Sequence, residues 1–150
     1  MTTNVAENVQ KAVIFAIDEK EYAINVGLVL SIERILPMTR VPNVPDYIKG
    51  VINLRGKIVP IMDLRLRLSM QEAPYTEESR IIILNVEGKE LGFIVDKALD
   101  VIDFSDEDIE DQPKVSGTQK EEFIKGVFRL GERLIILLDI DVILYEKGKM

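Results

Sequence analysis

The sequence predicts an all-β protein made of two small antiparallel barrel lobes, with only short helices. Three observations support this fold class. The chain repeats itself across its two halves, its apolar runs are short and rich in β-branched residues, and turn-forming residues separate these runs at regular intervals. Strands of this length and spacing favour small antiparallel barrels over a parallel sheet with crossover helices.

The internal repeat is clearest around residues 48–68, which read IKGVINLRGKIVPIMDLRLRL. Residues 124–144 read IKGVFRLGERLIILLDIDVIL, so the two segments match at an offset of 76. Upstream, residues 13–17 and 82–86 match at an offset of 69. The difference of seven residues must lie in a loop, and the acid-rich stretch 103–123 is the obvious place for it.

Each half is predicted to hold five strands in the same order. The strands expected in the first half cover residues 13–17, 22–26, 29–35, 51–54 and 57–62. Those expected in the second half cover residues 81–86, 91–95, 98–104, 127–130 and 133–138. Short polar turns join the first two and the last two strands of each half, which predicts a pair of hairpins in each.

Helices are expected to be minor. Asp63 and Asp139 occupy matched positions, and each carboxylate can cap a short helix, over 64–68 and 140–145 respectively. Between the third and fourth strands, residues 37–45 hold three prolines, which disfavour both a helix and a central strand.

The whole chain, 1–150, is predicted to be a single domain with two lobes. Repeat matching assigns about 12–70 to lobe one and about 78–147 to lobe two. A barrel of roughly 60 residues buries too little apolar surface to be stable alone. We therefore expect the lobes to share a core and to leave a groove between them where a partner can dock.

Composition excludes most catalytic chemistry. The chain has no cysteine and no histidine, which removes disulfides, thiolate ligands, the commonest general base and every Ser-His-Asp triad. It has no glycine-rich phosphate loop, and its acidic run lacks the glycine and glutamate spacing of a calcium loop. No catalytic, cofactor-binding or metal-ligating residue is predicted.

Charge and hydropathy bear on partners and location. The net charge of −7 argues against a nucleic-acid partner, because phosphate binding needs clustered basic residues. Residues 76–150 carry 10 basic against 18 acidic side chains, and this excess is either a solvated edge or a surface that steers a partner. With no secretory signal and no apolar stretch of about 20 residues, a cytoplasmic protein without membrane insertion is expected.

A few residues are candidates for binding. Arg55 precedes a turn glycine, and the other repeat has a glycine but no arginine in that turn, so the arginine looks dispensable for folding and suited to a carboxylate partner. Gly50 and its match Gly126 suggest a bend or a close backbone approach, while Gly92 suggests a bulge or a close contact with another chain. The candidate exposed valines, which alternation alone does not separate from core, are Val13, Val26 and Val29.

Residues 12–145 resemble the CheW family. The blocks that carry the resemblance are residues 15–24, residues 91–96 and above all residues 48–64, where a strand, an NLRG turn, a proline-containing strand and Asp-Leu follow one another. The resemblance implies two SH3-like five-stranded barrels around a shared core and no catalysis. It also implies a chemotaxis adaptor that couples chemoreceptor cytoplasmic tips to the histidine kinase CheA.

The resemblance further assigns residues to partners. Arg55, Val29, Gly50 and Gly92 match positions implicated in binding the tip of methyl-accepting chemoreceptors. Val13 and Val26 match an apolar surface that faces the regulatory domain of a CheA-type kinase.

The family often has an acid in the third strand, where this chain has Ser31 with Glu33 two residues further on. At this strand position the resemblance therefore does not supply the acid that would make a charge contact with the receptor.

Three alternatives remain open from the sequence. The chain could be a CheW-like regulatory module of a kinase or of an adaptor fusion. It could be a generic SH3-like peptide-binding module, although aromatic residues make up only 6% of the chain, which disfavours a groove for proline-rich peptides. A small β-barrel enzyme that uses carboxylates is the third, and the missing histidines weigh against it.

Overall fold

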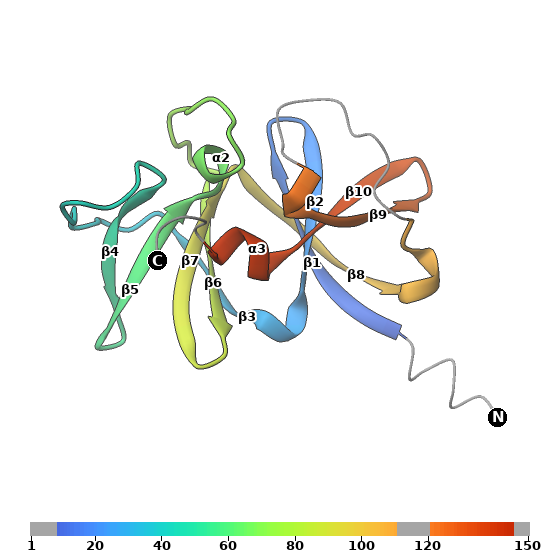
Figure 1. Cartoon of the computed structure of the whole chain (residues 1–150), viewed down its shortest axis with the longest axis horizontal. Helices are drawn as coiled ribbons and strands as arrows, with labels where there is room; N and C mark the ends of the chain where they lie inside the picture. The colour runs from blue at the N-terminus through green and yellow to red at the C-terminus, as the bar shows by residue number, and fades with distance from the viewer. Residues whose placement is uncertain (1–8, 111–120, 146–150) are drawn as a thin grey trace.

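A computed structural model describes residues 9–110 and 121–145, and it confirms the all-β prediction (Figure 1). Ten strands form two five-stranded sheets, with short helical segments at their junctions. The sheets lie next to each other along the long axis of the molecule, and the helices α2 (Leu64–Arg67) and α3 (Ile140–Leu144) lie between them.

The sheet that contains the first strand of the chain, which with its loops we call lobe A, has the strand order β8-β1-β2-β10-β9. Its strands are β8 (Lys97–Ser105), β1 (Val9–Ile17), β2 (Lys20–Asn25), β10 (Arg133–Leu138) and β9 (Ile124–Leu130). All neighbours are antiparallel except β2 and β10, which run parallel.

The second sheet, in lobe B, has the order β3-β6-β7-β5-β4. Its strands are β3 (Val29–Arg34), β6 (Arg80–Val86), β7 (Lys89–Val95), β5 (Lys57–Asp63) and β4 (Ile48–Leu54). The parallel pair here is β5 and β7, in the place that β10 and β2 hold in lobe A.

The lobes do not follow the two halves of the sequence, so the expected boundaries 12–70 and 78–147 are wrong as lobe boundaries. Each sheet takes a hairpin from one half and three strands from the other. Lobe B is the continuous segment 29–95, inserted between β2 and β8 of lobe A. The repeat shows which strands are equivalent, whereas long-range pairing decides which strands lie side by side.

The repeat itself is present in three dimensions as two matching rows of backbone partners. The row in sheet B runs through Gly50, Ile61, Gly92, Ile83 and Ser31. The row in sheet A runs through Gly126, Leu137, Ala23, Ile14 and Asp100. The offset is 76 for the first two members and 69 for the other three, so the seven extra residues lie between Asp100 and Gly126. Residues 111–120 of this connection lie outside the described residues.

Two ion pairs repeat in the same way. Lys57 Nζ lies 3.1 Å from Glu90 Oε2 across the parallel pair β5 and β7. Arg133 Nη2 lies 2.8 Å from Glu21 Oε1 across β10 and β2. The four residues match at the offsets of the repeat, so the two lobes share side-chain pairs as well as backbone topology.

Three apolar clusters hold the lobes together. One lies inside lobe A around Ile14 and Phe128, and one lies inside lobe B around Ile61 and Ile83. The largest contains buried side chains from both lobes and from α2 and α3, and we call it the inter-lobe core. The lobes thus share a core, as expected for small barrels that each bury little apolar surface.

The two short helices begin as predicted. Asp63 caps α2 by accepting from Arg65 N at 3.0 Å, and Asp139 caps α3 by accepting from Val142 N at 3.2 Å. Arg67 ties the helices together, because its guanidinium donates to the carbonyl oxygens of Ile143 and Tyr145 at the end of α3. A cation at a helix C-terminus satisfies carbonyls that have no partner within the helix.

Candidate functional site

Gly50 lies where the sheet of lobe B closes on itself. Thr39 and Val51 exchange backbone hydrogen bonds of 2.9 Å, which bridge the loop after β3 to β4. A Cβ atom at Gly50 would lie 2.4 Å from the carbonyl oxygen of Thr39, and the φ angle of Gly50 is +148°, which favours glycine. The matched bridge in lobe A joins Glu110 and Val127 beside Gly126.

Gly92 is buried inside lobe B. A Cβ atom there would lie 2.7 Å from Ile81 Cγ2 and 2.8 Å from Ile61 Cδ1. The matched position in lobe A is Ala23, so both barrels need a small residue at this point of the row. Gly50 and Gly92 therefore shape the lobe from within, and a substitution at either would reach a partner indirectly through the fold.

Arg55 is the exposed member of the predicted set. It forms the tip of the β4–β5 hairpin with Gly56, and both have positive φ, +53° and +83°. The matched residue in lobe A is Gly131, with φ +65°. A non-glycine residue in the left-handed region costs about 1–2 kcal/mol. Lobe B thus carries an arginine where the fold alone would favour glycine, and its Nη1 lies 3.9 Å from Glu33 Oε2.

The three predicted valines are less accessible. Val13 is only 4% exposed, because it lies in β1 between Ile24 of β2 and Val101 of β8. Val26, the first residue of the 3-10 helix η1 (Val26–Leu28), and Val29 are half-buried. The structure does not bring Val13, Val26 and Arg55 into one exposed patch.

Sequence reasoning missed exposed apolar residues on two of the four edge strands, β3 and β8, which we call the apolar surface. Leu30 and Ile32 of β3 are 48% and 42% exposed, and the matched Leu99 and Val101 of β8 are 38% and 54% exposed. Ile32 pairs with Ile82, which belongs to the inter-lobe core. The exposed residues thus continue the shared core to the surface, and the repeat offset of 69 relates their positions in the two strands.

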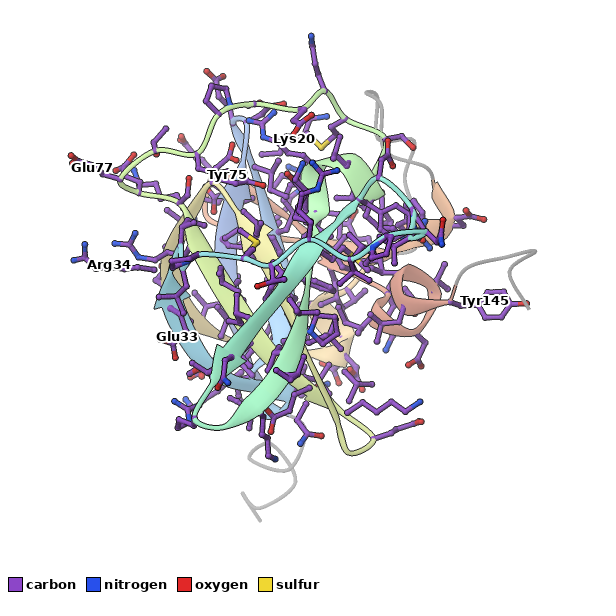
Figure 2. All side chains as sticks on the ribbon, turned by 90° about the vertical axis from the view of Figure 1, so that its left-hand side faces the viewer. Lys20, Glu33, Arg34, Tyr75, Glu77 and Tyr145 are labelled. Carbon is purple, nitrogen blue, oxygen red and sulfur yellow. The ribbon has the colours of Figure 1, made fainter. Side chains whose placement is uncertain are left out.

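Figure 2 shows strand β3 relative to the end of α3. Glu33 and Arg34 of β3 lie on one side of the molecule, and Tyr145, which follows α3, lies on the opposite side.

An arginine clamp fixes the two lobes to each other. Arg65 of α2 donates from Nη2 to Asp18 Oδ1 and to Asp96 Oδ2, both at 2.7 Å. Asp18 lies in the β1–β2 turn of lobe A, and Asp96 lies at the crossing from β7 to β8. Hydrogen bonding to Asp96 raises the pKa of Arg65 above its usual range, and Arg65 stays charged at any working pH.

Asp63 is a buried carboxylate at the start of α2. It is 1% exposed and accepts from the hydroxyl of Tyr75 at 3.1 Å as well as from Arg65 N. Burial raises the pKa of the Asp63 carboxyl above its ordinary value of 3.8, and the hydrogen bonds oppose this shift.

This burial gives a pH-dependent prediction for Asp63→Asn. The folded state binds the Asp63 proton more tightly than the unfolded state, so in the parent this carboxyl lowers the unfolding free energy as pH rises above 3.8, until it is fully ionised in the fold. Asparagine does not titrate. The stability of Asp63→Asn relative to the parent is therefore expected to increase with pH across this window and then level off.

Urea melts of both proteins from acidic to neutral pH check this prediction. Asp139→Asn at the matched cap controls for the change in capping group. A difference in unfolding free energy between Asp63→Asn and the parent that stays constant with pH would contradict it.

In the described part of the chain, no three His, Cys, Asp or Glu side chains are grouped as a metal site requires. None of its helices has the length and apolar character needed to cross a bilayer.

Exposed edge strands, a shared core and a hairpin-tip arginine define an all-β protein-docking module. Comparison with known proteins gives its family. Residues 11–148 match the family model described as "CheW-like domain", and the chain belongs to this family. It is therefore a chemotaxis coupling adaptor, a scaffold without catalysis.

Individual relatives agree with the family model. The chain is 43% identical over 141 residues to the chemotaxis protein CheW of Bacillus subtilis, which covers 93% of this chain and 89% of that protein. It is 40% identical over 135 residues to that of Klebsiella aerogenes, covering 90% and 81%. The crystal structure of the scaffolding protein TtCheW from Thermoanaerobacter tengcongensis superposes with a TM-score of 0.84 at 32% identity, covering 93% of this chain and 90% of that one.

Proposed function

We propose that this adaptor couples the cytoplasmic tips of methyl-accepting chemoreceptors to the regulatory domain of a CheA-type histidine kinase, in the cytoplasm. The observation that carries the receptor half is the apolar surface on β3 and β8. Its members, Leu30, Ile32, Leu99 and Val101, are exposed at matched positions of the repeat. Apolar rows of this kind suit the apolar face of a partner helix.

Arg55 is the proposed polar contact beside this surface. Its side chain is 65% exposed, and the nearest carboxylate, that of Glu33, is at the outer limit of an ion pair. An exposed pair at this distance contributes little to stability. The guanidinium therefore remains available for a carboxylate of the receptor, for which a planar fork of donors is well suited.

The other predicted residues enter the proposal in different ways. Val29 supports the receptor surface from the inter-lobe core, while Gly50 and Gly92 keep the shape of lobe B. On the kinase side, Val13 and Val26 remain the predicted residues, and Val26 offers the more accessible side chain of the two.

Kinase control by such a scaffold depends on differential affinity. An adaptor that binds two kinase states equally well shifts no equilibrium between them. Co-sedimentation of the purified adaptor with a receptor signalling fragment and with a kinase regulatory domain, separately and together, tests the proposal as a whole. Binding to neither partner would overturn it.

Arg55→Gly tests the receptor contact without disturbing the fold. Glycine accepts the positive φ of this turn, so the unfolding free energy should stay within about 1 kcal/mol of the parent or rise slightly. Binding to the receptor fragment should weaken by about tenfold, which corresponds to the loss of one charge-assisted contact.

The control is Arg129→Ala, which removes an exposed arginine from β9 of lobe A. Equal receptor affinity for Arg55→Gly and the parent, measured by titration calorimetry, would remove Arg55 from the site.

A further inference from the structure

The repeat places α2 and α3 in equivalent positions, yet the two helices meet the opposite lobe differently. Beside α2, six apolar residues from the two lobes are covered, with exposures of 4% or less. These covered residues are Ile17, Tyr22, Leu68, Ile124, Ile136 and Leu138. The Arg65 clamp closes this junction, and Arg65 Nη1 also holds the carbonyl oxygen of Gln71, just after the helix, at 3.0 Å.

Beside α3, the equivalent junction is open. A groove of about 590 Å³ lies between α3, β5 and the β6–β7 hairpin, and Tyr145 lines its rim. Its apolar lining consists of the residues that the repeat matches to the six covered residues beside α2. Several of these lining residues are half-buried or exposed. These lining residues are Ile48, Pro60, Met62, Val86, Leu91 and Leu144.

The charges at the open junction explain why no clamp forms there. The match of Arg65 is Asp141, and the match of Asp18 is Glu87, which has a similar positive φ of +53°. Both acids line the groove, together with Glu90 and Lys89. Glu90 is already paired with Lys57. Where the junction beside α2 has an arginine between two carboxylates, the junction beside α3 has two acids, which a cation would stabilise.

We propose that this groove binds a segment of the kinase regulatory domain in which an arginine stands next to an aliphatic or methionine side chain. The arginine would bridge Asp141 and Glu87 as Arg65 bridges its two carboxylates, and the apolar side chain would cover Leu91 and Leu144. A groove with an apolar floor and an acidic rim is complementary to such a segment in both respects.

The position of the groove also fits a second partner. Tyr145, which lines the groove, lies on the side of the molecule opposite to Glu33 and Arg34 of β3, so a receptor docked on β3 would leave the groove free (Figure 2). Tyr145 is 56% exposed at its rim, whereas Val13 offers only 4% of its surface to a kinase. This inference rests on the proposed function, because it takes the kinase as the partner.

Asp141→Arg tests the groove. The new arginine is expected to pair with Glu87, occupy the place meant for the partner's arginine and repel that residue. Affinity for the kinase regulatory domain, measured by titration calorimetry, should fall at least tenfold, while affinity for the receptor fragment should stay within twofold. Glu77→Arg, the same charge reversal at an exposed site away from the groove, is the matched control (Figure 2).

The outcomes separate the two proposals. Unchanged kinase affinity of Asp141→Arg would overturn the groove and leave the proposed function standing. Failure of the parent to bind the kinase would overturn both. A melting temperature above that of the parent would add support, since it would show that Asp141→Arg recreates the clamp of the other lobe.

A photo-cross-linker identifies the occupant directly. With p-benzoylphenylalanine in place of Tyr145, irradiation of the full adaptor with the kinase domain should yield a cross-link to a kinase peptide that contains an arginine. The same group in place of Val101, exposed on β8, should yield none. A cross-link only within the chain, or only to a second copy of it, would overturn the proposal.

Discussion

Gly50→Ala is expected to destabilise the fold by about 3–5 kcal/mol, a large part of the 5–15 kcal/mol that holds an ordinary domain together. Two costs add. The new Cβ would lie 2.4 Å from the carbonyl oxygen of Thr39, and backbone cannot move aside as a flexible side chain can. The φ angle of +148° is also one that alanine rarely adopts.

Two other glycines provide a graded comparison. At Gly126 a new Cβ would lie 2.5 Å from Ile109 Cγ2 and 2.9 Å from the carbonyl oxygen of Glu110, a longer backbone approach than at Gly50. Gly126 also has no positive φ, so the expected cost is smaller. At Gly56 nothing lies within 4 Å of a new Cβ, and only the positive φ opposes alanine, at a cost of about 1–2 kcal/mol. Urea melts should rank the variants Gly50→Ala, Gly126→Ala and Gly56→Ala in that order. A melt of Gly50→Ala that matches Gly56→Ala would show that the closure of lobe B is not rigid.

Arg65→Ala is expected to destabilise by about 2–3 kcal/mol, because it removes charge-assisted hydrogen bonds and leaves Asp18 and Asp96 close together without a cation. This loss of unfolding free energy is smaller than the cost of breaking a fully buried ion pair, because the two acids remain partly hydrated. Receptor affinity should also fall, since the apolar residues on β3 and β8 belong to different lobes that the clamp aligns.

Arg65→Lys separates charge from geometry. Lysine keeps the positive charge but cannot reach both carboxylates with a planar fork, so it should recover less than half of the lost stability. Denaturant melts give the free energies, and hydrogen exchange of the β1–β2 turn reports on the junction. Exchange and melting that are both unchanged in Arg65→Ala would show that the inter-lobe core alone sets the orientation.

The strands and short helices were predictable because their signals are local. Runs of β-branched residues, turn residues and capping aspartates repeat in both halves, and Asp63 and Asp139 cap helices as predicted. Which strands form each lobe was not predictable, because this depends on parallel pairs between strands far apart in sequence, such as β2 with β10. A repeat identifies equivalent strands but contains no information about their neighbours.

The same distinction applies to the site. The exposed position of Arg55 in a turn was predictable, because the repeat has a glycine in its place. Its role in binding stays a prediction. The clamp was not, since Arg65, Asp18 and Asp96 come from three separate segments. The exposure of the Leu30, Ile32 and Val101 side chains could not be predicted for another reason. Apolar residues on an edge strand have the same sequence pattern whether they are buried or exposed.

The insertion of lobe B into lobe A has a consequence for synthesis on the ribosome. All five strands of sheet B have been made once residue 95 is joined, whereas sheet A still lacks three of its strands. Until β9 and β10 arrive, the N-terminal hairpin displays Tyr22 and Ile24, which are fully buried in the finished protein. A nascent chain that stops early would therefore keep a complete lobe B beside an uncovered apolar hairpin, a combination that chaperones and proteases recognise.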